Sequence, residues 1–157
     1  MNFRKKEFAL LSRKVKSEMK NGIELDEAVN SIYDNVRYTS ISSKDDLVRG
    51  FGDVVDKLQE KGYNVFRVKN TLKDTNASYR GVNTIVENEE GYKFELQFHT
   101  KESFNIKQEN HILYEEQRLD NTSEKRKNEI NIEMKKNNKI IDLPKAINSI
   151  QQFNKLK

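Results

Sequence analysis

One short segment, residues 92 to 99, constrains the fold of this chain more than any other. Its even positions carry Tyr, Phe, Leu and Phe, and its odd positions carry four polar residues: Lys93, Glu95, Gln97 and His99. A strict period of two is typical of a β-strand, because successive side chains of a strand point to opposite faces of the sheet. The segment therefore predicts a strand with one face packed on an apolar core. The simplest interpretation of its other face is the solvated side of an antiparallel sheet.

The rest of the chain predicts helices and strands around this segment. Apolar residues recur at helical spacing between Ser43, which begins a capping-box-like sequence, and Gly62, a typical helix stop, so a helix is predicted over 43–62. Strict alternation after Gly62 would place Val65 and Arg67 on one face of a strand. Strands are predicted over these further segments: 36–41, 63–69 and 79–87. Further helices are predicted within 1–32, over 101–119 and over 121–138, together with a short C-terminal helix that starts at Pro144 and carries Ile147, Ile150 and Phe153.

The order of these elements indicates an α+β (mixed α/β) fold. A helix joins the first two predicted strands and a hairpin joins the last two, which favours a single mixed β-sheet of about four to five strands flanked by helices. At 157 residues, the chain has the length of one domain. We expect a single domain over 1–157, with N-terminal helices (1–32), a catalytic-like core (33–119) and C-terminal helices (120–157).

Composition excludes several classes of site. The absence of Cys excludes a disulfide scaffold, a thiolate metal site and a cysteine nucleophile, and only two His exclude a multi-histidine zinc centre. No apolar run approaches the ~20 residues of a membrane span, and the N-terminus lacks the apolar region of a signal peptide. We therefore expect no membrane partner. The net charge of +4 argues only weakly for a polyanionic ligand.

Polar residues on two strands and one helix predict a pocket. The face that carries Glu95 would lie beside a strand with polar or small residues at Tyr79, Gly81 and Asn83. The helix that follows sets ionisable groups along one stripe: Lys107, His111, Glu115 and Arg118. An outer helix face would look the same. If the two surfaces meet, they would form a polyanion pocket with a carboxylate available for metal or proton chemistry.

Two further cations could contribute to such a pocket. Arg37 lies inside a predicted strand, where an arginine is more often a salt-bridged edge residue than a ligand group. In a phosphate-binding protein the same guanidinium could fork onto a phosphate and stack on a base. Lys69 ends the following strand and, taken alone, is equally open to both interpretations.

Four segments together resemble a known superfamily. The chain resembles the synthetase domain of the RelA/SpoT-type alarmone synthetases in the order and spacing of three parts: Lys69, Tyr79–Asn83 and Glu95–Thr100. The resemblance is greater to a variant found as a C-terminal toxin domain in phage structural proteins and secreted bacterial effectors. The four segments that carry it span somewhat over half the chain: Asp34–Thr39, Tyr79–Thr84, Phe94–Thr100 and Lys107–Arg118.

The resemblance implies a nucleotidyltransferase-like synthetase fold and a reaction. The family transfers the β,γ-pyrophosphate of ATP to a ribose hydroxyl of a nucleotide, and some toxin relatives use the 3′ end of tRNA. Glu95 matches the glutamate that binds Mg²⁺ and activates the acceptor hydroxyl, and Arg37 matches the arginine that packs on the ATP adenine. Lys69 matches a phosphate-binding lysine, and Tyr79 the residue that stacks on the acceptor base. Positioning and charge neutralisation are what phosphoryl-type transfer requires.

The resemblance also extends to supporting residues. Gln97 lies beside Glu95 and is expected in the catalytic group. The remaining residues expected to bind nucleotide are these: Asn83, His99, Lys107, His111 and Arg118. Ile32 stands where the synthetases have a second magnesium-binding aspartate, and Asp34 is the nearby carboxylate that could replace it. Asn83 and His99 stand where the synthetases have a histidine and an arginine.

Such a toxin implies an antitoxin or immunity protein and a cytoplasmic site of action, whether or not it is delivered within a larger secreted or phage protein. Two other functions stay open. An NAD-dependent ADP-ribosyltransferase-type toxin would draw on Arg37, Thr39 or Ser40, and Glu95. A non-catalytic RNA- or partner-binding module would use the basic runs at 4–6, 13–14 and 125–127.

Overall fold

The computed structural model describes most of the chain: residues 2–5, 15–16, 19–25, 32–33 and 35–155. Most of the helical residues expected within 1–32 lie outside this described part, and so does Asp34. The backbone of Asn2–Lys5 (β1) is a strand, whereas the sequence predicts only helices there. The strand forms because its backbone pairs antiparallel with the edge of the next strand along the chain.

A single mixed sheet organises the described residues, as predicted. Its order is β1-β2-β5-β4-β3-β6, so β5, the strictly alternating segment, lies near the middle. β5 is parallel to β2 and antiparallel to β4. The sheet has six strands rather than four or five, because two short edge strands join the predicted ones. The strands after β1 have these bounds: β2 (Val36–Ser42), β3 (Asn64–Asn70), β4 (Val82–Glu87), β5 (Lys93–Thr100) and β6 (Phe153–Asn154).

The C-terminal segment differs from the prediction of a helix up to Phe153. Only Ile147–Ser149 (η1) is helical, as a single 3₁₀ turn. The chain then extends, and Phe153–Asn154 (β6) pairs with β3. Pairing to this edge satisfies backbone groups that a longer helix would leave exposed on β3.

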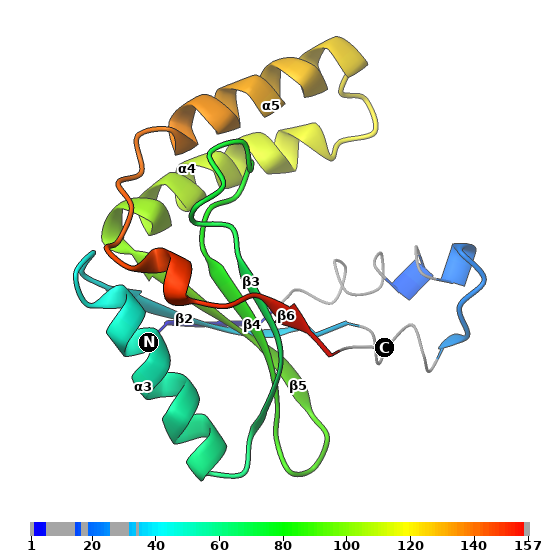
Figure 1. Ribbon diagram of the computed structural model, residues 1–157. Helices are drawn as coiled ribbons and strands as arrows, with labels where there is room; N and C mark the ends of the chain where they lie inside the picture. The colour runs from blue at the N-terminus through cyan, green and yellow to red at the C-terminus, as the bar shows by residue number, and fades with distance from the viewer. Residues whose placement is uncertain (1, 6–14, 17–18, 26–31, 34, 156–157) are drawn as a thin grey trace.

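The helix predicted over 43–62 forms as α3 (Leu47–Glu60), and it packs against the apolar face of the sheet. Figure 1 shows α3 lying along this face. Leu47 is fully buried, and Phe51 meets Phe98 of β5 edge to face with ring centroids 5.0 Å apart. The helix begins later than the capping-box-like sequence at Ser43 suggests: Asp46 is its N-cap, and the Ser43 hydroxyl accepts a hydrogen bond from the backbone N–H of Asp46 at 3.1 Å in the turn that precedes the helix.

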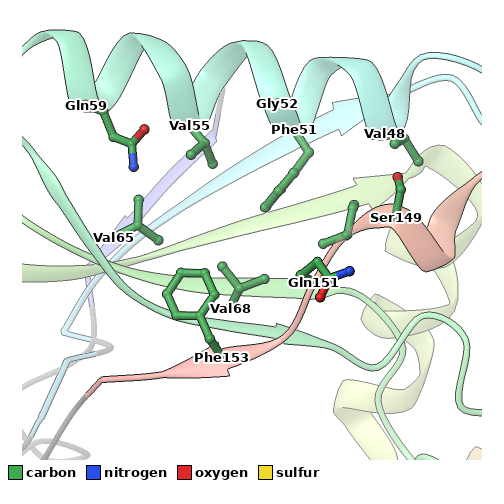
Figure 2. Close-up of a pocket in the computed structure, with 11 residues that line it drawn as sticks. Val48, Phe51, Gly52, Val55, Gln59, Val65, Val68, Ser149, Gln151 and Phe153 are labelled. Atoms are coloured by element: carbon green, nitrogen blue, oxygen red, sulfur yellow. The ribbon is translucent and has the colours of Figure 1, made fainter.

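A groove of about 350 Å³ lies on this same apolar side (Figure 2). It runs between α3 and the C-terminal segment, with Val48, Phe51 and Val55 on one wall and Phe153 on the other. Because the apolar residues of β5 point toward α3, this groove lies on the opposite side of the sheet from Glu95.

Two helices form a hairpin at the top of Figure 1: α4 (Lys101–Gln117) and α5 (Glu124–Asn138). Thr100 caps α4 in a capping box with Ser103, so the helix starts directly where β5 ends. The short connection between the helices makes them antiparallel neighbours. Among the described residues, no helix is both long and apolar enough to cross a membrane.

A buried arginine fastens this hairpin to the loop before β4. Arg80 donates from Nε to the carbonyl of Leu72 at 2.7 Å and from Nη1 to the carbonyl of Asn138, the last residue of α5, at 2.6 Å. Asn138 in turn donates to the carbonyl of Ala77 at 2.8 Å. Burial lowers the pKa of Arg80, and carbonyl oxygens satisfy its donors in place of a carboxylate. The loop and the end of α5 are therefore held as one piece.

Two glycines, Gly52 within α3 and Gly62 just after it, predict opposite effects of substitution by Ala on stability. A Cβ at Gly52 meets nothing within 4 Å, so Gly52→Ala should raise the free energy of unfolding by up to about 1 kcal/mol through helix propensity. Gly62, at the end of the helix, has φ +80°, so Gly62→Ala should lower it by about 1 kcal/mol. Urea titrations measure the change in the free energy of unfolding of each variant. Changes of the same sign in both variants would contradict this interpretation of the two glycines.

Candidate active site

The polar face of β5 is buried, so the interpretation as a solvated sheet face is wrong. Glu95 is 5% exposed, Gln97 2% and His99 0%. Glu95 is paired in register with Arg37 of β2 and Ile85 of β4. Since residues directly opposite each other point to the same face, these side chains form one row across the sheet. A buried polar face requires partners for each of its groups.

Glu95 receives hydrogen bonds from three side chains. Arg37 Nε donates to Oε2, and Oε1 accepts from Asn83 Nδ2 at 2.9 Å and from Gln97 Nε2 at 3.0 Å. Gln97 also accepts from Lys107 Nζ at 2.6 Å, so α4 is joined to the same network. The structure therefore brings four other predicted site residues together around the Glu95 carboxylate, three by direct hydrogen bonds and Lys107 through Gln97.

Tyr79 and His99 form the neighbouring part of the network. The Tyr79 hydroxyl donates to Asn83 Oδ1 at 2.6 Å and lies 2.9 Å from His99 Nε2. Because its single proton goes to Asn83, we assign the Nε2–H tautomer to His99, with Nδ1 accepting from the Ser103 hydroxyl at 2.9 Å. Burial lowers the pKa of His99 to about 3, helped by the charges of Lys107 and Arg37. His99 is thus neutral and acts on the site by holding Tyr79.

Gly81 is required by this arrangement. A Cβ at this position would lie 2.5 Å from the Tyr79 hydroxyl and 2.6 Å from His99 Cε1. Both distances are far below van der Waals contact, so only glycine lets the ring and the imidazole approach each other here. Burial raises the pKa of Tyr79 above its usual range, which keeps the phenol protonated.

The other predicted residues are placed less uniformly. Lys69 is paired in register with Asn83, so it lies on the Glu95 face, where it is exposed and makes no ion pair with any described residue. His111 is exposed on α4 and makes no hydrogen bond or ion pair with the described residues of the Glu95 network. Arg118 lies roughly 16 Å along α4 from Lys107 and pairs with Glu115 at 3.7 Å. The helix stripe therefore reaches the site only at Lys107.

The network provides one carboxylate for a metal ion. Within the described residues no group of three or more His, Asp or Glu could hold a cation, and Asp34, the second expected ligand, lies outside them. Mg²⁺ commonly binds through one or two carboxylates together with substrate phosphates and water. Glu95 fits that donor set once Oε2 is released by Arg37.

Arg67 also lies on this face, which the sequence reasoning missed. The predicted alternation puts Val65 and Arg67 on one face, but Val65 belongs to the apolar core. The register shifts between these two residues, so Arg67 is paired with Ile85 and joins the row of Glu95 and Arg37. The available signal was a charged residue between two apolar neighbours in a strand.

Sequence and structure comparisons give different results. No family model and no curated protein sequence matches the chain. Small alarmone synthetase 2 from Bacillus subtilis superposes with a TM-score of 0.61 at 21% identity, over 88% of this chain and 72% of that one. Small alarmone synthetase 1 from the same organism, bound to its product pppGpp, gives 0.59 at 16% identity, over 87% and 68%.

The type VI effector Tas1, crystallised with its immunity protein, has a TM-score of 0.51 at 19% identity, over 87% of this chain and 79% of that one. At such identities the comparisons establish the fold. The chain has the fold of the small alarmone synthetases, and the predicted nucleotidyltransferase-like synthetase fold is confirmed.

The neutral state of His99 predicts a pH dependence of stability. The His99 imidazole takes up a proton near pH 6.5 in the unfolded chain but only near pH 3 in the folded chain. Between these pH values the unfolded state therefore binds more protons at His99. His99 should therefore reduce the free energy of unfolding as pH falls below about 6.5, by up to about 1.4 kcal/mol per pH unit. Urea titrations from about pH 5 to 6.5 measure this slope with little contribution from carboxyl groups. His99→Gln should flatten it and exposed His111→Gln should not; an unchanged slope in His99→Gln would contradict the assignment.

Gly81→Ala should separate Tyr79 from His99. The added methyl group occupies the space of the phenol oxygen, so we expect a loss of about 1–3 kcal/mol of stability. Thermal unfolding measures the loss, and the imidazole ¹⁵N shifts of His99 report whether its Nε2 hydrogen bond is broken. Unchanged shifts in a folded Gly81→Ala protein would show that the close approach is not as described.

Proposed function

We propose that this chain is a RelA/SpoT-like enzyme that transfers pyrophosphate from ATP to a ribose hydroxyl of a nucleotide or of an RNA end such as that of tRNA. One observation carries the proposal. A buried carboxylate, Glu95, lies in the middle of a sheet face with Arg37, Lys69 and Lys107 around it, on the fold of the small alarmone synthetases. One base surrounded by cations suits a reaction in which polyphosphate is positioned and a hydroxyl is deprotonated.

The proposed step needs no covalent enzyme intermediate. The acceptor hydroxyl oxygen attacks the β-phosphorus of ATP, a new bond forms between them, and the bond from that phosphorus to the α,β-bridging oxygen breaks. AMP leaves with the bridging oxygen, and the hydroxyl proton passes to Glu95. Gln97 and Asn83 hold the carboxylate in place through their amide donors. Held in this way, the base loses no rotamer freedom when the acceptor arrives.

The cations have separate parts in this proposal. Lys69 and Lys107 reach phosphate oxygens and offset the charge of the triphosphate. Mg²⁺ bound at Glu95 would supply further neutralisation of the transferred group. Arg37 pairs with Glu95. Packing of the ATP adenine on the guanidinium would draw Arg37 away and leave Oε2, which has two lone pairs, open to both Mg²⁺ and the acceptor hydroxyl.

We further propose that the activity is toxic and that the chain has an immunity protein or antitoxin. The support is the similarity in fold to Tas1, a type VI effector crystallised with its immunity protein. ATP and RNA are cytoplasmic substrates, so the cytoplasm is the proposed site of action, whatever larger secreted or phage protein delivers the domain.

Glu95→Gln tests the reaction. The amide keeps the size of the side chain but cannot accept the proton, so the rate of AMP release from ATP with an acceptor should fall by about 10²- to 10⁴-fold. Glu109→Gln removes a carboxylate from the exposed side of α4 and is the matched control, with an unchanged rate expected. A circular dichroism melt verifies that both variants are folded.

An assay of AMP release, together with RNA-binding measurements, separates the alternatives. Purified protein is incubated with Mg²⁺ and with ATP or NAD in the presence of pooled nucleotides or total tRNA, and the products are identified by mass spectrometry. Consumption of NAD without ATP would favour an ADP-ribosyltransferase. RNA binding that is steeply salt-dependent and unaffected by Glu95→Gln, with no AMP released, would favour a binding module. Either result would overturn the proposed transferase.

A further inference from the structure

We infer that Asn35 reads the adenine of the donor nucleotide, through the N6 amine and N7 of the base. This inference deepens the proposed function, and it rests on that function for the identity of the ligand as ATP packed on Arg37. The Asp34–Thr39 segment carries part of the family resemblance, but the resemblance gives Asn35 no role. The assignment comes from an unsatisfied amide oxygen, from the residues on either side of it and from the hydrogen-bonding groups of adenine.

The side-chain oxygen of Asn35 is buried and makes no hydrogen bond. A buried amide oxygen without a donor is unfavourable, and the large majority of buried polar side-chain atoms in native proteins have a partner. Both oxygens of the nearby Glu95 carboxylate, by contrast, accept hydrogen bonds. An acceptor left open beside a network that is otherwise paired indicates a donor that arrives with the ligand.

The residues two before and two after Asn35 both reach the Glu95 face of the sheet. Arg37 donates to Glu95, and the ring centroid of Tyr33 lies 5.7 Å from Lys93 Nζ. Lys93 shares the face of Glu95 because one residue separates the two in β5. Asn35 itself directly precedes β2, so it lies at the edge of the site beside Arg37.

The cation at this end of the face is engaged with other groups. Lys93 Nζ pairs with Glu87 Oε1 at 2.8 Å and also lies 5.5 Å from the ring centroid of Phe66. It gives no hydrogen bond to the oxygen of Asn35. The amide is therefore open to a ligand rather than reserved for a neighbouring side chain.

Adenine has the groups that fit an amide. Its N6 amine donates and its N7 accepts along one edge, and an asparagine can pair with both at once, through its oxygen and its NH₂ group. Guanine presents two acceptors, O6 and N7, along the same edge and cannot form this pair. The backbone of Asn35 lies roughly 6 Å from that of Arg37, so a base packed on the guanidinium is within reach of the amide.

The donor base, rather than the acceptor base, is the ligand that this position favours. The acceptor base is expected on Tyr79, which contacts His99 at the other end of β5. His99 lies roughly 20 Å along the strand from Lys93. The two bases would therefore occupy opposite ends of the site face, with Asn35 at the end that Arg37 serves.

The primary measurement compares three triphosphates on the full, unaltered chain by calorimetry, without Mg²⁺ so that no transfer takes place. ATP carries both the amine and N7, purine riboside triphosphate lacks the amine, and 7-deaza-ATP lacks N7. ATP should bind roughly 5- to 150-fold more tightly than purine riboside triphosphate, because loss of the amine leaves the buried oxygen of Asn35 unsatisfied. 7-Deaza-ATP should lie between the two, since it keeps the amine.

Two variants assign this discrimination to Asn35. Asn35→Leu removes both amide groups, so the preference for ATP over purine riboside triphosphate should fall to within about twofold. Asn35→Asp keeps an acceptor but has no donor, so it should retain the preference for the amine and lose the preference for N7. Asn128→Leu removes an exposed amide of α5 and is the matched control, with the ratios of the unaltered chain expected. Ratios of affinity cancel the effect of the charge that Asp introduces on the triphosphate.

The melting temperature separates recognition from a structural role. Asn35→Leu removes an unsatisfied buried oxygen, so its melting temperature without ligand should stay the same or rise. Equal affinity of the unaltered chain for ATP and purine riboside triphosphate, no measurable binding of any of the three, or unchanged ratios in Asn35→Leu would overturn the inference. Selectivity for ATP that depends on Asn35 in a protein that releases no AMP would sustain it while the proposed reaction fails. Equal use of ATP and purine riboside triphosphate as donors would sustain the reaction while the inference fails.

Discussion

The burial of the polar face of β5 is the constraint on which the rest of the site depends. A carboxylate placed inside a protein needs donors directed at it, and Glu95 finds them on β2, on β4 and on its own strand. The donors on β2 and β4 link Glu95 to both neighbouring strands, and the network continues through Gln97 to Lys107 on α4. The site is thus set by strand pairing rather than by loops, which gives positions that vary little when a ligand binds.

Much of this arrangement could be predicted from sequence because it follows short-range patterns. The alternation over residues 92 to 99 identified the central strand, and helical spacing identified α3, α4 and α5. The edge strands β1 and β6 could not be found in this way. They are too short for a periodic signal, and they form because an edge elsewhere in the chain is open to them.

The candidate site was predictable in its members and less so in their roles. Glu95, Gln97, Asn83, Arg37 and Lys107 do converge, but whether a polar strand face is wet or buried depends on what packs over it, which no local pattern contains. His99 looked like a ligand group and is a neutral support for Tyr79. Arg67 was missed because one inserted residue reverses the face of each position that follows it in the strand.

The junction at Arg80 gives the molecule a cooperative unit. One guanidinium joins the loop that leads to Tyr79 with the last residue of α5, by hydrogen bonds to carbonyls alone. Opening of the helical hairpin would take the Asn138 carbonyl away from Nη1 and leave that buried donor without its acceptor, so we expect loop and hairpin to open together. Amide protons of α5 and of the loop would then exchange with solvent at a common rate. A partner that bound the hairpin of α4 and α5 would therefore also stabilise the ordered conformation of the residues around Tyr79.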